Sequence, residues 1–65
     1  YIRAIIYGDL GQHQKAIQNF DQAIRLDPLY TAAYEGRGES YRRLGQYTKA
    51  DADHAKACSL DRTYC

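Results

Sequence analysis

The chain repeats itself at an interval of 34 residues, and this period restricts its fold more than any other feature. When the sequence is shifted by 34 positions, 11 of the 31 aligned pairs are identical. The longest identical stretch pairs Leu10-Gly11-Gln12 with Leu44-Gly45-Gln46. Such self-similarity is typical of proteins in which one small helical unit stacks on the next, because a single unit cannot bury its own apolar face.

Each repeat has the apolar spacing of two helices. Ala16, Phe20 and Ala23 recur at i, i+4 and i+7, and Ile17 and Ile24 widen the same stripe. No alternating run long enough for a β-strand is present. We therefore predict an all-α fold with helices at about 1–10, 13–26, 31–44 and 47–60.

Glycine and proline mark the expected helix ends. Gly11 and Gly45 each follow a leucine and suit the left-handed conformation that ends a helix. Pro28 should end the second helix at Asp27, since proline disfavours helical geometry in the preceding residue. Thr31 is the expected cap of the third helix.

These residues and their spacing resemble the tetratricopeptide repeat, a helix–turn–helix unit of 34 residues. The family pattern is W-x2-L-G-x2-Y, then A-x3-F, then A and P. The second repeat meets it with Tyr34, Gly38, Tyr41, Ala50, His54 and Ala57. The first repeat meets it with Ala4, Tyr7, Ala16, Phe20, Ala23 and Pro28. Arg37 departs from the pattern at the Leu position and Arg62 at the Pro position, and the details resemble bacterial members of the family.

The resemblance implies a right-handed stack of two helix–turn–helix units that acts as a non-catalytic protein–protein interaction module. The first repeat, residues 1–30, is expected to be truncated at its start, and residues 31–65 to form the second and C-terminal repeat. Asp51 and Cys58 stand where the first repeat has Ile17 and Ile24. A polar face there suits a terminal repeat, because nothing stacks on it.

Composition narrows the classes of partner. Nine Lys and Arg against eight Asp and Glu give a net charge of +1, which argues against nucleic acid or an anionic membrane. No apolar run reaches the length of a bilayer span, and no targeting segment is visible, so the cytoplasm is slightly favoured. Cys58 and Cys65 are too few for a disulfide framework, and we expect free thiols; a local bridge or a link between chains through Cys65 are the alternatives.

The resemblance also places a partner-binding groove on the first helix of each pair. Its expected residues are Tyr1, Ile5, Asp9, Glu35, Glu39, Arg42 and Arg43. Because both signs of charge are present, the expected ligand is a peptide or helix of another protein with alternating charge. Family members that clamp a carboxylate terminus use Lys and Asn here, and Tyr1, Ile5 and Gly36 stand at the matching positions, so that sub-function is not expected. Glu39 and Arg43, four residues apart, are expected to form an ordinary surface ion pair.

The first helix offers an alternative function. Ile2, Ile5 and Ile6 give it more apolar surface than one partner helix can cover, and about three repeats are ordinarily needed for a stable stack. This edge therefore predicts self-association into a homo-oligomer, as the assembly segment of a longer repeat array.

A polar pair is expected at the seam between two helices. Arg37 has the reach to meet Asp53 on the facing helix, while in the first repeat Asn19 offers Arg3 a neutral acceptor. The hypothesis is that the Arg37–Asp53 pair fixes the register of the two helices.

The chain shows no constellation that predicts catalysis. His54 and Cys58 lie four residues apart on one helix, which is a metal-ligand spacing, but two ligands are too few for a metal site. His54 also occupies an aromatic position of the repeat, which favours a half-buried histidine. Cys58 with His54 lacks a visible pocket or oxyanion donors, so we expect no enzyme activity, no metal and no cofactor.

Overall fold

The computed structural model describes residues 12–65, and this part of the chain is all-α, as predicted. It contains α2 (His13–Leu26), α3 (Thr31–Arg43) and α4 (Tyr47–Leu60), followed by a short 3-10 turn, η1 (Arg62–Tyr64). The three α-helices match the ranges expected from the sequence to within one residue at each end. The helix predicted at residues 1–10 lies outside the described residues.

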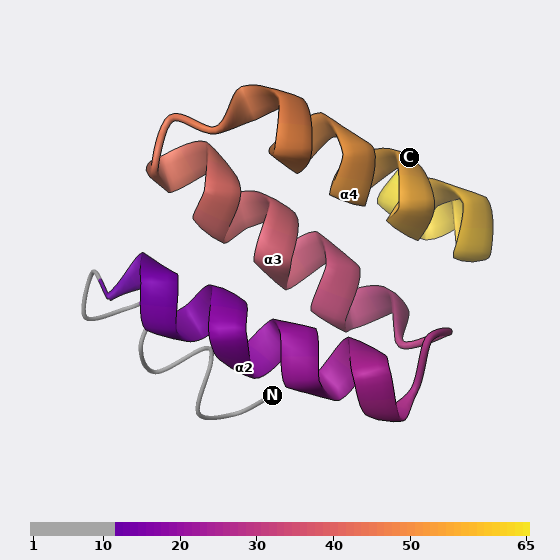
Figure 1. Cartoon of the computed structure of the whole chain (residues 1–65). Helices are drawn as coiled ribbons and strands as arrows, with labels where there is room; N and C mark the ends of the chain where they lie inside the picture. The colour runs from indigo at the N-terminus through magenta and orange to yellow at the C-terminus, as the bar shows by residue number, and fades with distance from the viewer. Residues whose placement is uncertain (1–11) are drawn as a thin grey trace.

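The helices form a single layer in which α3 occupies the middle. It packs against α2 on one side and α4 on the other, and the chain reverses direction at each turn (Figure 1). In the described residues, no helix is both long and apolar enough to cross a bilayer. The arrangement makes α3 the helix on which both packing interfaces depend.

Gly45 ends α3 in the way the sequence predicts. Its φ of +78° lies in the left-handed region, where a side chain would be strained. The amide of Gly45 donates to the carbonyl of Arg42 at 3.0 Å, and the amide of Gln46 donates to the carbonyl of Tyr41 at 2.9 Å. These two bonds form a Schellman motif, which satisfies the last carbonyls of α3 and turns the chain towards α4.

The cap expected at Thr31 is wrong. α3 already includes Thr31, its N-cap residue is Tyr30, and no side chain caps it. The Thr31 hydroxyl instead donates backwards to the carbonyl of Leu29 at 3.4 Å. The polar side chain that organises this turn belongs to Asp27, whose Oδ1 accepts the amide of Leu29 at 3.1 Å.

The apolar core follows the predicted stripe of α2. Ala16, Phe20 and Ala33 are buried together, and the residues packed around them are Ala23, Ile24 and Tyr30. Phe20 is the largest of the buried side chains in this cluster and fills the space between α2 and α3. Small residues on both helices let the ring fit.

Small residues also set the distance between α3 and α4. A Cβ atom built on Gly38 would lie 3.2 Å from the carbonyl oxygen of Ala50 and 3.2 Å from the Cβ of Asp53. Ala50 and Ala57 are buried on the facing side of α4. The two backbones therefore approach closely, as the predicted pairing of Gly38 with small residues requires.

Replacing Gly38 by leucine should lower the free energy of unfolding by about 2 to 3 kcal/mol, because the longer side chain would overlap the α4 backbone. Urea unfolding followed by circular dichroism at 222 nm measures the change. Ala55→Leu is the matched control, since Ala55 is exposed on α4 and its replacement should change stability by less than about 0.5 kcal/mol. Equal losses in the two variants would contradict the close approach.

Candidate functional site

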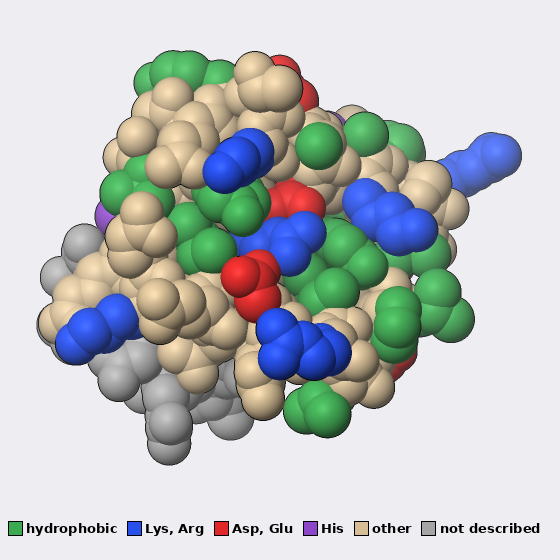
Figure 2. All heavy atoms as spheres, viewed as in Figure 1, with side chains coloured by type: hydrophobic (Ala, Val, Ile, Leu, Met, Phe, Trp, Pro, Cys, Tyr) green, Lys and Arg blue, Asp and Glu red, His purple; other side chains and the backbone are tan. Residues whose placement is uncertain are grey.

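Arg37 lies at the junction of the three helices. Its Nε donates to Oδ2 of Asp53 at 2.8 Å and its Nη2 donates to Oδ1 at 2.7 Å, so the two planar groups face each other in a bidentate pair. Its Nη1 donates to Oδ1 of Asp21 on α2 at 2.8 Å. We call these three residues the arginine cluster. Figure 2 shows blue and red side chains in contact at the centre of the face it presents.

Burial differs between the two carboxylates. The Asp53 side chain is 7% exposed and that of Asp21 is 41% exposed, while Arg37 lies between them at 21%. The hydrogen bond to Asp53 raises the pKa of Arg37; burial opposes this and Asp21 adds to it, so the guanidinium stays charged. A charge in a helix seam is costly unless it is paired, and Asp53 supplies the pairing.

Aromatic rings flank the same guanidinium. The Arg37 Cζ atom lies 5.6 Å from the centroid of the Tyr34 ring and 6.0 Å from that of Tyr41. Both rings lie on α3 with Arg37 and attract its charge through their π faces. Burial raises the pKa of the Tyr41 phenol, and the positive charge of Arg37 opposes that rise.

The sequence suggested the contact with Asp53 but missed Asp21. Comparison of the repeats contained a signal, since the residue that matches Asp21 in the second repeat is Ala55. An aspartate that occurs in the repeat preceding Arg37, and not at the matching position of the second repeat, is a candidate partner for that arginine. The contact crosses from one repeat to the next, so the pattern within one repeat cannot reveal it.

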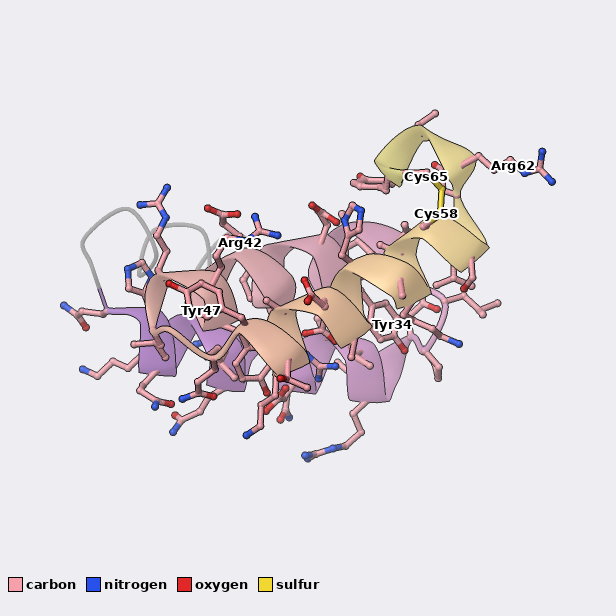
Figure 3. The ribbon with its side chains drawn as sticks, turned by 90° about the horizontal axis from the view of Figure 1, so that it is seen from above. Tyr34, Arg42, Tyr47, Cys58, Arg62 and Cys65 are labelled. Carbon is pink, nitrogen blue, oxygen red and sulfur yellow. A yellow bond between two sulfur atoms is a disulfide. The ribbon has the colours of Figure 1, made fainter. Side chains whose placement is uncertain are left out.

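Three of the four predicted groove residues of α3 form local ion pairs on this helix, and the fourth, Glu35, faces α4. Oε2 of Glu39 accepts from Arg42 at 2.9 Å, and its Oε1 accepts from Arg43 at 3.1 Å. Oε2 of Glu35 lies 3.3 Å from Nδ1 of His54 on α4. We call the four residues Glu35, Glu39, Arg42 and Arg43 the α3 charge row. In Figure 3, Arg42 projects on the side of the ribbon where Cys58 and Cys65 also lie.

The remaining predicted site residues cannot be placed. Tyr1, Ile5 and Asp9 of the groove, with Ile2 and Ile6 of the self-association edge, lie outside the described residues. Of the predicted groove residues the structure thus describes the four of the α3 charge row, and the groove and the edge stay predictions.

The expectation of two free thiols is wrong, because Cys58 and Cys65 form a disulfide. α4 ends at Leu60, and the turn that follows folds back until the two Cα atoms are 4.8 Å apart. In this state Cys58 has no thiolate to offer a metal or a substrate. No group of three possible metal ligands occurs within residues 12–65.

Comparison with known proteins identifies the family. The model of the family described as tetratricopeptide repeat matches residues 2–58, and the chain belongs to this family. Proteins of this family generally act as non-catalytic modules that bind other proteins. The class agrees with the all-α fold and with the 34-residue period.

Three relatives illustrate the match. The chain is 36% identical over 59 residues to tetratricopeptide repeat protein 37 of Xenopus laevis, and 36% identical over 59 residues to superkiller complex protein 3 of Homo sapiens. It is 32% identical over 59 residues to small glutamine-rich tetratricopeptide repeat-containing protein 2 of Mycosarcoma maydis. Each alignment covers 91% of this chain but only 4%, 4% and 17% of the relative, respectively. No solved structure matches the chain.

Arg37 and Asp53 should be strongly coupled in a double-mutant cycle of unfolding free energies. Arg37→Leu leaves the buried carboxylate of Asp53 without its partner, and Asp53→Leu leaves Arg37 only the more exposed Asp21, so each change should cost about 3 kcal/mol. The double variant should lose less than the sum, with a coupling of about 1 to 3 kcal/mol. Urea unfolding of the four proteins gives the value.

The same cycle with Asp21→Leu is the matched comparison. Because Asp21 is 41% exposed, its coupling to Arg37 should stay below about 1 kcal/mol and weaken in salt. A coupling near zero for Asp53 would reject its role in fixing α3 against α4.

Proposed function

We propose that this chain binds a segment of a partner protein along the α3 charge row, as a non-catalytic interaction module. The partner segment is an extended peptide or a helix that carries charges of both signs. Tyr1, Ile5 and Asp9 are proposed to extend the same surface on the first helix. The chain spans only 4% to 17% of the length of these relatives. Any activity of a longer protein that contains it is therefore also a proposal.

The observation that carries the proposal is that the charged side chains near the end of α3 are exposed and, among residues 12–65, paired only with each other. The side chains of Glu39, Arg42 and Arg43 are 46%, 48% and 63% exposed, and their bonds are local ion pairs on one helix. Pairs of this kind contribute only about 0 to 1 kcal/mol, so a partner can replace them at little cost. These side chains can therefore exchange their present ion-pair partners for charged groups of a ligand.

The arginine cluster supports the proposal from another part of the same helix. Arg37 binds α3 to α2 and to α4, so the backbone that presents the charge row is held on both flanks. A rigid helix loses little conformational freedom when a ligand binds, which leaves more of the contact energy for affinity.

Self-association through Ile2, Ile5 and Ile6 remains the alternative. None of these residues is described by the structure, so it stays a prediction from sequence. Sedimentation equilibrium measures the solution mass of Ile6→Asp and of the unaltered chain. A lower mass of the variant would support self-association, and binding of a groove ligand should not depend on it.

Peptides of designed charge test the proposed ligand class. Three 12-residue probes of equal length are titrated into the chain: one alternates Lys and Glu, one carries only Lys, and one carries only Glu as its charged residue. We expect the alternating probe to bind most tightly and to shift the NMR signals of α3 near Glu35 and Glu39. Tightest binding by a single-sign probe, or shifts confined to other helices, would contradict the proposal.

Exchanging the signs of two groove charges should weaken binding of the alternating probe at least about tenfold. The variant is Glu39→Lys with Arg42→Glu, which leaves the net charge unchanged. The matched control, Asp51→Lys with Lys56→Glu, makes the same exchange on exposed positions of α4 and should change the dissociation constant less than about twofold. Equal effects of the two variants would show that binding does not depend on the α3 charge row.

A further inference from the structure

The turn after α4 repeats the main hydrogen bonds of the turn after α2. Asp27 donates its amide to the carbonyl of Ala23 at 2.9 Å, and Asp61 donates to that of Ala57 at 2.9 Å. The carbonyls of Asp27 and Asp61 accept the amides of Tyr30 and Tyr64 at 3.0 and 3.1 Å, respectively. The 34-residue repeat of the sequence is therefore accompanied by a repeat of the turn hydrogen bonds.

The aspartate side chain acts alike in both turns. Oδ1 of Asp61 accepts the amide of Thr63 at 3.0 Å and its hydroxyl at 2.8 Å, just as Asp27 accepts the amide of Leu29. The bonds from Thr63 lower the pKa of Asp61. Local hydrogen bonds thus form each turn in the same shape.

The two turns differ in what restrains them further. Pro28 limits the backbone of the first turn, and Ile24 and Tyr30 pack against the apolar core beside it. In the second turn Arg62 replaces the proline, while Tyr64 is half-buried as Tyr30 is. Cys58 stands at the position of Ile24, and the disulfide to Cys65 supplies the restraint that proline and the apolar contact give the first turn.

We propose that the Cys58–Cys65 disulfide is a thiol–disulfide exchange site, at which a dithiol reductant releases the turn after α4. In the closed state, the disulfide holds residues 62–65 against the end of α4. In the open state, the local hydrogen bonds of Asp61 and of the turn backbone remain, with the packing of the half-buried Tyr64. The redox state of Cys58 and Cys65 therefore determines whether residues 62–65 are held in one direction relative to α4.

Accessibility decides which sulfur reacts. Cys65 is exposed and Cys58 is half-buried, so a thiolate of the reductant attacks Sγ of Cys65. The S–S bond breaks, Cys58 departs as a thiolate that takes up a proton, and Cys65 is held in a mixed disulfide. The second thiol of the reductant then attacks the reductant's first sulfur, which is bonded to Cys65 in the mixed disulfide, and Cys65 is released as a thiol. Two electrons and two protons pass to the chain, and the dithiol becomes a disulfide.

Reduction should open the turn and leave the helices folded. The chain is prepared in air and then treated with dithiothreitol, and iodoacetamide labelling with intact mass spectrometry counts the thiols. We expect no adduct before reduction and two after it. Hydrogen exchange at the amides of Tyr64 and Cys65 should become at least about tenfold faster, since the cross-link closes a loop across a sequence separation of seven, while α2 and α3 exchange unchanged.

Two variants make the outcome decisive. In Cys65→Ser, dithiothreitol should have no effect on exchange, and the turn should exchange at the rate of the reduced chain. In Arg62→Pro, reduction should accelerate exchange less than about threefold, because proline restores the restraint of the first turn and Asp61 already has the extended backbone, ψ 115°, that proline prefers before it. Adducts before reduction, or exchange at Tyr64 that does not respond to it, would overturn the proposal. Equal acceleration in Arg62→Pro and the unaltered chain would overturn the equivalence of proline and disulfide.

Discussion

The described fold depends on a charged side chain at a position where the family pattern has leucine. Arg37 reaches α4 through a bidentate pair with Asp53 and reaches α2 through Asp21. Small residues make the reach possible, because Gly38 lets α3 and α4 approach until their backbones are in contact. Without a partner, the buried carboxylate of Asp53 would oppose that approach, so the charge pair and the close packing require each other.

This constraint connects the packing of α3 to the proposed binding surface. The arginine cluster and the apolar core of Phe20 hold α3 on both flanks, and the exposed charges of the same helix are left in weak local pairs. A binding surface needs such a division, in which a rigid support carries side chains that can change partners. The family assignment fits this division, since its members generally bind other proteins.

Most of the fold could be predicted from the sequence because the period of 34 residues indicates repeated units and because glycine and proline mark the helix ends locally. Gly45 is an example, since its left-handed φ follows from its place after a helix. The cap at Thr31 was misplaced by one residue, because α3 already begins at Thr31 and its N-cap residue is Tyr30. Asp21 was missed because its contact with Arg37 joins two repeats, and residue spacing within one repeat does not show it. The Cys58–Cys65 bond was only an alternative to free thiols, because the spacing of the two residues does not show that the turn after α4 folds back. The groove was predicted from the resemblance to the family, and its residues Tyr1, Ile5 and Asp9 lie outside the described part of the chain.

The central claim is that Arg37 joins helices of two repeats into one cooperative unit. Native-state hydrogen exchange in a series of low urea concentrations tests it most directly, because it measures the opening free energy of each amide separately. The account predicts that the most protected amides of α2 and α4 share one opening free energy and one urea dependence in the unaltered chain, and separate in Arg37→Leu. Separate opening of α2 and α4 in the unaltered chain would contradict it.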